Sequence, residues 1–84
     1  MYGIATRYSA GHITATTRYG ADRPRVRISY PFDAGEGTPA HRRAVDALME
    51  RFPEIARMEA QGYTLKPGTD PQDPDRILWV WVVA

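Results

Sequence analysis

Apolar and polar residues alternate in three segments of the first third of the chain. The alternation covers residues 2–8, 13–18 and 25–30, and it is clearest in the last of these, where Val26 and Ile28 stand between arginines and a serine. Because successive side chains of a strand point to opposite faces of a sheet, each segment is predicted to be a strand. Turn-forming residues separate the three segments, at residues 9–12 and 19–24. The three strands are therefore expected to form an antiparallel meander.

A helical pattern follows a glycine-containing loop at residues 33–37. Four large apolar residues recur at helical spacing, namely Val45, Leu48, Met49 and Phe52. Thr38 is predicted to cap the helix, with Pro39 at its first helical position. Pro53 lacks the amide hydrogen that a helix interior needs, so the helix is predicted to bend or to end there. Further helical turns are expected over residues 54–61.

The chain closes on seven consecutive apolar residues, 77–83. In a strand, both faces of this segment would be apolar: Ile77, Trp79, Trp81 and Val83 on one, and Leu78, Val80 and Val82 on the other. That pattern is typical of a central strand that is buried on both sides. A short strand is predicted at residues 63–65. Residues 66–75, with three prolines and three aspartates, are predicted to be an exposed loop.

These elements predict an α+β fold, a single domain over residues 1–84 with the element order β-β-β-α-β-β. The sheet is expected to be mostly antiparallel, with one bent helix packed on one face. If the helix covered the Leu78 face, Trp79 and Trp81 would be left for a second copy or another partner, because aromatic residues dominate interface hot spots. If it covered the tryptophans, the arginines and the Leu78–Val80–Val82 stripe would share the open side as a mixed interface.

Basic residues gather in the first three predicted strands. Residues 1–30 hold five arginines and one aspartate, whereas residues 31–84 hold six basic and nine acidic residues. Four of the arginines are predicted to share one sheet face: Arg7, Arg18, Arg25 and Arg27. Tyr30 lies near a strand end, like Tyr8 and Tyr19, and is placed to stack on bases. Such a face suits an acidic protein surface, a nucleic acid or a signalling nucleotide, although the net charge of +1 is low for a DNA-binding domain.

The sequence contains no pattern that indicates catalysis or a metal site. Cysteine is absent, and the two histidines, His12 and His41, fall in different predicted elements. The loop at residues 35–37 precedes a helix but lacks the lysine of phosphate-binding loops. We therefore expect a protein that is not an enzyme and that holds no cofactor and no metal.

The apolar segments are short. The longest has seven residues, far below the ~20 that a membrane-spanning helix needs. The N-terminal residues lack the basic and apolar regions of a signal peptide. These features, with the absence of cysteine, predict a soluble protein of the cytoplasm.

Several segments carry a resemblance to known proteins: Thr6-Arg7-Tyr8, Ile13-Thr14-Ala15-Thr16, Ile28-Ser29-Tyr30-Pro31-Phe32-Asp33, His41-Arg42-Arg43-Ala44 and Ala47-Leu48. Together with the aromatic and aliphatic last strand, they resemble small accessory proteins of tailed bacteriophages and prophages. The resemblance implies action in the cytoplasm of a bacterial host and supplies no catalytic residues. Small proteins of this context often inhibit host machinery, as anti-CRISPR and other anti-defence proteins do.

We therefore expect a non-enzymatic, phage-type binding protein that inhibits a host defence system or a nucleic-acid enzyme by protein–protein contact. The candidate contact residues are Arg7, Arg18, Arg25, Arg27, Tyr30, Trp79 and Trp81. The alternative is direct binding of a nucleic acid or a signalling nucleotide through the arginine and tyrosine face. A homodimer is a further arrangement that the apolar last strand allows.

Overall fold

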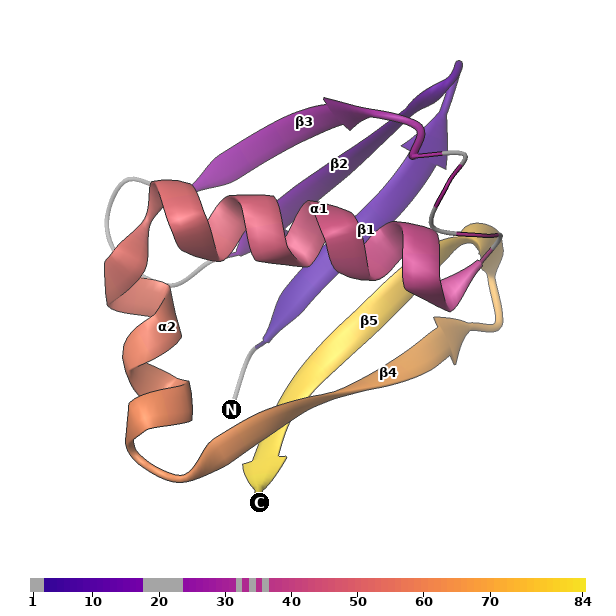
Figure 1. Cartoon of the computed structure of the whole chain (residues 1–84). Coiled ribbons are helices and arrows are strands. Elements are labelled where there is room, and N and C mark those ends of the chain that lie inside the picture. Colours follow the sequence, from indigo (N-terminus) through magenta and orange to yellow (C-terminus); the bar gives the residue numbers. More distant parts are fainter. Residues whose placement is uncertain (1–2, 18–23, 32, 34, 36) are drawn as a thin grey trace.

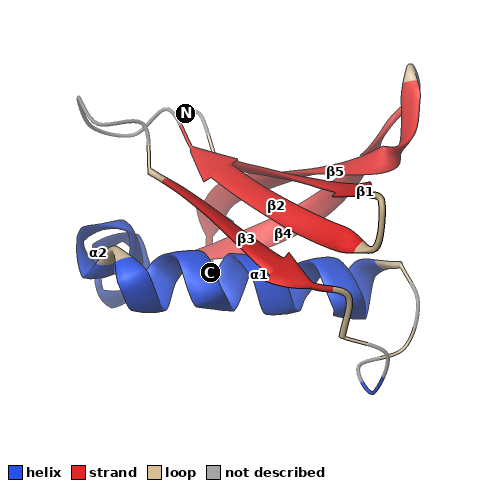
Figure 2. Ribbon diagram, turned by 90° about the horizontal axis from the view of Figure 1, so that it is seen from above, coloured by secondary structure: helices blue, strands red, loops and turns tan. Residues whose placement is uncertain are grey.

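The computed structural model of the chain describes residues 3–17, 24–31, 33, 35 and 37–84. Its elements are β1 (Ile4–Ser9), β2 (His12–Thr17), β3 (Arg25–Ser29), α1 (Thr38–Arg51), α2 (Pro53–Ala60), β4 (Tyr63–Asp70) and β5 (Asp73–Val83). The strands form one antiparallel sheet in the order β3-β2-β1-β5-β4. Both helices lie on the same face of this sheet (Figure 1, Figure 2). The predicted α+β class is confirmed.

A two-residue turn joins β1 to β2. Ser9 pairs with His12, and the two residues between them, Ala10 and Gly11, have φ angles of 50° and 80°. Positive φ at both central positions matches a type I′ turn, whose twist fits the twist of the two strands. Gly11 adopts this conformation without the steric cost that a Cβ brings. The turn predicted at residues 9–12 is confirmed, whereas the one at residues 19–24 lies almost wholly outside the described residues.

Pro53 divides the helical region, as the sequence predicts. Phe52 leaves the helical conformation, with φ −125° and ψ 79°, and Pro53 then begins α2. Thr38, the predicted N-cap of α1, is instead its first helical residue, and Gly37 is the N-cap. No described helix is long and apolar enough to cross a membrane.

The β4–β5 hairpin differs most from the sequence prediction. Residues 66–75 are predicted to be a loop, but β4 continues to Asp70 and β5 begins at Asp73. The prolines and aspartates of this segment do not form a loop, because they lie in the narrow turn and at the sheet edge. The carboxylate of Asp70 accepts a hydrogen bond from the backbone N–H of Gln72, and that of Asp73 accepts one from the backbone N–H of Asp75. Both contacts are of the type that aspartate makes in turns.

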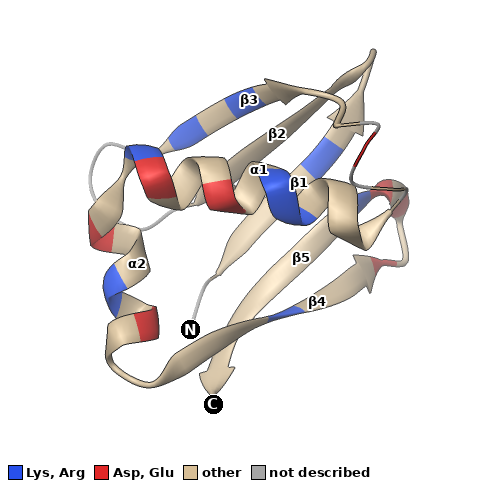
Figure 3. Ribbon diagram, viewed as in Figure 1, with Lys and Arg blue, Asp and Glu red and all other residues tan. Residues whose placement is uncertain are grey.

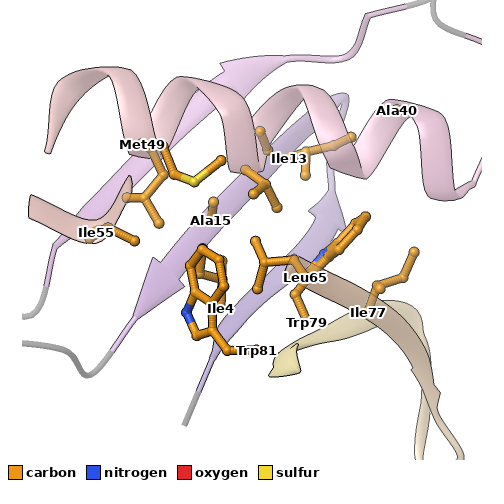
Figure 4. Close-up of a cluster of buried hydrophobic side chains, with 13 residues drawn as sticks. Ile4, Ile13, Ala15, Ala40, Met49, Ile55, Leu65, Ile77, Trp79 and Trp81 are labelled. Carbon is orange, nitrogen blue, oxygen red and sulfur yellow. The ribbon is translucent and has the colours of Figure 1, made fainter. Parts of the chain in front are cut away.

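The helices cover the face of the sheet that carries the two tryptophans. Trp79 and Trp81 are only 3% and 5% exposed, and they belong to one apolar cluster with residues of α1 and β4 (Figure 4). The α1 residues in this cluster are Ala40, Ala44, Val45, Leu48 and Met49. The proposed partner contact through Trp79 and Trp81 is therefore not available in this fold, because both side chains are core residues. A homodimer through the tryptophan face is ruled out for the same reason.

The other face of β5 is only partly covered. Leu78 and Val82 are half-buried and Val80 is 45% exposed. β5 does lie inside the sheet, between β1 and β4. The prediction that it is buried on both sides is nevertheless wrong, because both helices lie on one face and no described element covers the other.

A buried hydrogen-bonded group joins the sheet to α1. Thr6 is fully buried, and its Oγ1 accepts a hydrogen bond of 2.9 Å from the indole N–H of Trp79. The same hydroxyl lies 2.8 Å from Nδ1 of His41 and 3.4 Å from the carbonyl oxygen of Ile77. The shorter contact favours donation of the hydroxyl hydrogen to Nδ1, which requires a neutral His41. Three elements, β1, β5 and α1, thus meet at one oxygen atom.

Replacing Thr6 with valine tests this group. Thr6→Val keeps the shape of the side chain but leaves the indole N–H of Trp79 and Nδ1 of His41 without their partner. We expect the free energy of unfolding to fall by about 1–3 kcal/mol, measured by urea unfolding followed by circular dichroism. Thr16→Val, on the open face, is the matched control and should change stability by less than about 0.5 kcal/mol. Equal losses in the two variants would contradict a special role for the Thr6 hydroxyl.

Candidate functional site

The candidate site is the face of the sheet that the helices leave open. Strand alternation directs three of the four predicted arginines to it, Arg7, Arg25 and Arg27. The fourth, Arg18, lies outside the described residues. Arg76 of β5 joins them, and the sequence prediction misses it because it follows directly on the predicted loop at residues 66–75. Figure 3 shows the basic positions of β1 and β3 on neighbouring parts of the sheet.

The strand register sets the arginines in a row. Arg76 pairs with Arg7, Arg7 pairs with Thr14, and Thr14 pairs with Arg27. The row therefore crosses β5, β1, β2 and β3. Arg25 lies two residues from Arg27 on β3, at the same sheet edge. We call these four arginines, with the face they share, the arginine face.

The arginine face surrounds a shallow hollow of about 490 Å³. Its lining consists of arginines and small residues: Ala5, Arg7, Ser9, Ala10, Thr14, Thr16, Arg25, Arg27 and Arg76. A guanidinium group is planar and always charged, and it can bind a carboxylate or phosphate through two parallel hydrogen bonds. The described residues of this site can therefore bind anions.

Two of the four arginines already have carboxylate partners. Nε of Arg7 lies 2.8 Å from Oδ2 of Asp73, and Nη1 of Arg76 lies 3.8 Å from Oδ2 of Asp70. The hydrogen bond from Arg7 lowers the pKa of Asp73 below its ordinary value of 3.8 and raises the pKa of Arg7. Both pairs are solvent-exposed, so they contribute little to stability. The Arg7–Asp73 pair shows that a guanidinium group of this face can hold a carboxylate at hydrogen-bond distance.

The two arginines of β3 differ from Arg7 and Arg76 in their described surroundings. Among the residues that the structure describes, no carboxylate pairs with Arg25 or Arg27. Nη2 of Arg27 lies 3.1 Å from Nδ1 of His12, which also lies 3.1 Å from the carbonyl oxygen of Ala10. Nδ1 can accept from Arg27 or donate to Ala10, but it cannot do both in one tautomer. The β3 arginines are therefore the part of the arginine face that is open to an external carboxylate.

An apolar stripe adjoins the arginines on the same side of the sheet. Leu78, Val80 and Val82 alternate along β5 with the buried tryptophans. Lys66 of β4 pairs with Val80 and adds a further positive charge beside the stripe. The structure thus selects the second of the two arrangements that the sequence leaves open, in which arginines and aliphatic residues share one exposed surface.

Tyr30 does not belong to this surface. It lies on the helix side with Tyr8, and the two rings meet edge to face, with centroids 5.4 Å apart and planes at 87°. Both line a second hollow of about 470 Å³, which His41 also lines. The prediction that the tyrosines share a face with the arginines is wrong for Tyr8 and Tyr30, because strand alternation sets them with the core residues. Tyr19 lies outside the described residues.

His41 has a structural environment rather than a metal-binding one. It is 5% exposed, and burial lowers the pKa of its imidazole from the ordinary value of 6.5, although the charge of Asp75 opposes this shift. Its Nδ1 is engaged with Thr6. No group of three or more histidine, aspartate or glutamate side chains within the described residues is arranged to hold a metal ion.

No protein-family model, curated protein or solved structure matches this chain.

The lowered pKa of His41 makes the fold sensitive to acid. Above pH 6.5 the imidazole is neutral in both states, but below 6.5 the unfolded chain takes up a proton that the folded chain resists. The free energy of unfolding should therefore fall as the pH drops from 6.5 toward the lower pKa of the folded state. His41→Asn keeps a side chain that can bond to Thr6 but does not titrate. The free energy of unfolding of this variant should therefore fall less on acidification than that of the wild type. Urea unfolding of both proteins at neutral pH and at pH about 5 measures this, and equal falls would contradict the assignment.

Proposed function

We propose that the chain is a non-enzymatic binding protein that inhibits a partner protein by covering an acidic surface of that partner. The observation that carries this proposal is the presence of the arginine face and the stripe of Leu78, Val80 and Val82 on one exposed side of the sheet. Buried aliphatic contacts supply binding energy, and charge complementarity supplies selectivity and speed of association. A surface that carries both suits a protein partner.

The composition of the open side favours a protein over a nucleic acid. Proteins that bind single strands on a sheet stack the bases on aromatic side chains. The described residues of the open side include no phenylalanine, tyrosine or tryptophan, whereas Tyr8 and Tyr30 lie on the helix side. Direct nucleic-acid or nucleotide binding is thus the weaker alternative.

The charge of the open side favours a different protein over a second copy of this chain. Of the described residues, five cationic side chains lie on it or at its edge, against two carboxylates: Arg7, Arg25, Arg27, Lys66 and Arg76 against Asp70 and Asp73. Pairing two identical faces would set like charges against each other in a partly desolvated contact. A partner with an excess of carboxylates relieves this repulsion.

The resemblance of the sequence to phage and prophage accessory proteins supplies the biological context of the proposal. In that context the partner is a bacterial host protein, either a component of a defence system such as CRISPR or a nucleic-acid enzyme. Such enzymes bind polyanions through basic grooves, but an acidic surface elsewhere on them, or on a protein they assemble with, can be covered by the arginine face. Inhibition then follows from occupation of a surface and needs no chemical step.

A pull-down with surface variants tests the proposal. Tagged protein is incubated with nuclease-treated bacterial lysate, and bound proteins are identified by mass spectrometry. We expect the wild type to retain a stoichiometric partner that is lost in Arg25→Ala/Arg27→Ala and in Val80→Asp. Arg51→Ala/Arg57→Ala removes two exposed charges from the helices instead and is the matched control. It should retain the partner.

Two results would count against this function. Recovery of nucleic acid or a nucleotide without a protein partner, with affinity that falls steeply with salt, would support the ligand-binding alternative. A protein partner retained equally by all variants would show that the contact surface lies elsewhere.

A further inference from the structure

We infer that the outer edge of β3 binds an extended, acidic segment of the partner protein as an added sixth strand beside the five of the sheet. This inference rests on the proposed function, because it states how a partner engages the arginine face. It differs from that proposal in naming the backbone edge of β3 as part of the contact.

The hydrogen bonds at the two ends of β3 define which of its residues face β2. The backbone N–H of Tyr30 donates to the carbonyl oxygen of Gly11 at 2.9 Å, and that of Thr17 donates to the carbonyl oxygen of Pro24 at 3.1 Å. In an antiparallel pair, alternate residues bond to the same neighbouring strand. The even-numbered residues from 24 to 30 therefore direct their backbone groups toward β2.

The odd-numbered residues of β3 direct their backbone groups outward. These residues are Arg25, Arg27 and Ser29, and all three are exposed. β3 is an end strand of the sheet, and no described element pairs with its outer side. Figure 1 shows this edge at the side of the sheet remote from β4. Unpaired N–H and C=O groups in a row are the template on which an added strand forms.

The opposite edge of the sheet lacks this property. The backbone N–H of Ala84 donates to the carbonyl oxygen of Gly62, so the even-numbered residues of β4 face β5 and the odd-numbered ones face outward. Pro67 is one of the outward residues, and it has no N–H to donate. A proline at this position protects an edge strand from further pairing. Of the two edges, only that of β3 offers an uninterrupted row of donors and acceptors.

The side chains of β3 select the sequence of the added strand. A residue directly opposite Arg25 or Arg27 has its side chain on the same face as that arginine, where a glutamate or aspartate forms a favourable cross-strand pair. Residues between these positions lie on the helix side, beside the half-buried Val26 and Ile28. The preferred segment therefore alternates acidic and apolar residues. A second copy of β3 in full antiparallel overlap would place Arg27 opposite Arg27, which is unfavourable.

A synthetic peptide tests this inference. The probe is a short peptide of alternating valine and glutamate, and its binding is measured by fluorescence anisotropy. We expect it to bind the wild type, and a matched peptide with lysine in place of glutamate not to bind. Arg25→Ala/Arg27→Ala should weaken binding by about tenfold, as expected for the loss of two cross-strand charge pairs. Ser29→Pro removes an outward N–H but keeps both arginines and the pairing with β2, and should weaken binding to a similar extent.

The backbone contribution has a second, independent test that uses the unchanged protein. Methylation of the glutamate nitrogens in the peptide removes the donors that would face β3, and it should abolish binding even if Ser29→Pro fails to fold. Equal binding of the methylated peptide, or no binding of the unmodified one, overturns the inference. If the methylated peptide binds fully but Arg25→Ala/Arg27→Ala does not bind, the edge contact is refuted while the arginine face of the proposed function stands.

Discussion

The burial of Trp79 and Trp81 beneath α1 is the interaction on which the rest of this structure depends. The two side chains fill the space between the sheet and the helix, and the indole N–H of Trp79 is fixed by the hydroxyl of Thr6. A chain of 84 residues with two short helices can cover one sheet face. Once the tryptophan face is covered, no described element remains to cover the other face, where Arg7, Arg25 and Arg27 are exposed and Leu78 and Val82 are half-buried.

The first three strands and the face that their arginines share are predictable from the sequence. Alternation identifies β1, β2 and β3, and it assigns Arg7, Arg25 and Arg27 to a common face before any contact is known. The choice of the covered face is not visible in β5 alone, because both of its faces are apolar. It is decided by strand register, which sets Leu78 and Val80 on the side of the arginines. Covering that side would have required burial of several guanidinium groups, at a cost of several kcal/mol each.

The sequence prediction errs at two places in the site, the β4–β5 hairpin and the tyrosines. Prolines and aspartates at residues 66–75 indicate a loop, so the long β4–β5 hairpin, Lys66 and Arg76 are missed as contributors to the open side. In a two-stranded ribbon at a sheet edge, a proline costs no hydrogen bond if its nitrogen faces outward. The tyrosines show the opposite error, since Tyr8 and Tyr30 lie near the arginines in sequence but on the other face. Proximity along a strand is a poor guide where side chains alternate.

Tryptophan fluorescence reports directly on whether α1 covers the sheet, because Trp79 and Trp81 are the two tryptophans of the chain. If α1 covers them, their emission in the native protein is that of an apolar environment, and iodide quenches it far less than in urea, where the chain is unfolded. Native emission that iodide quenches as strongly as in urea would mean that the tryptophan face is open. The arginine face would then not be the surface that the fold leaves for a partner.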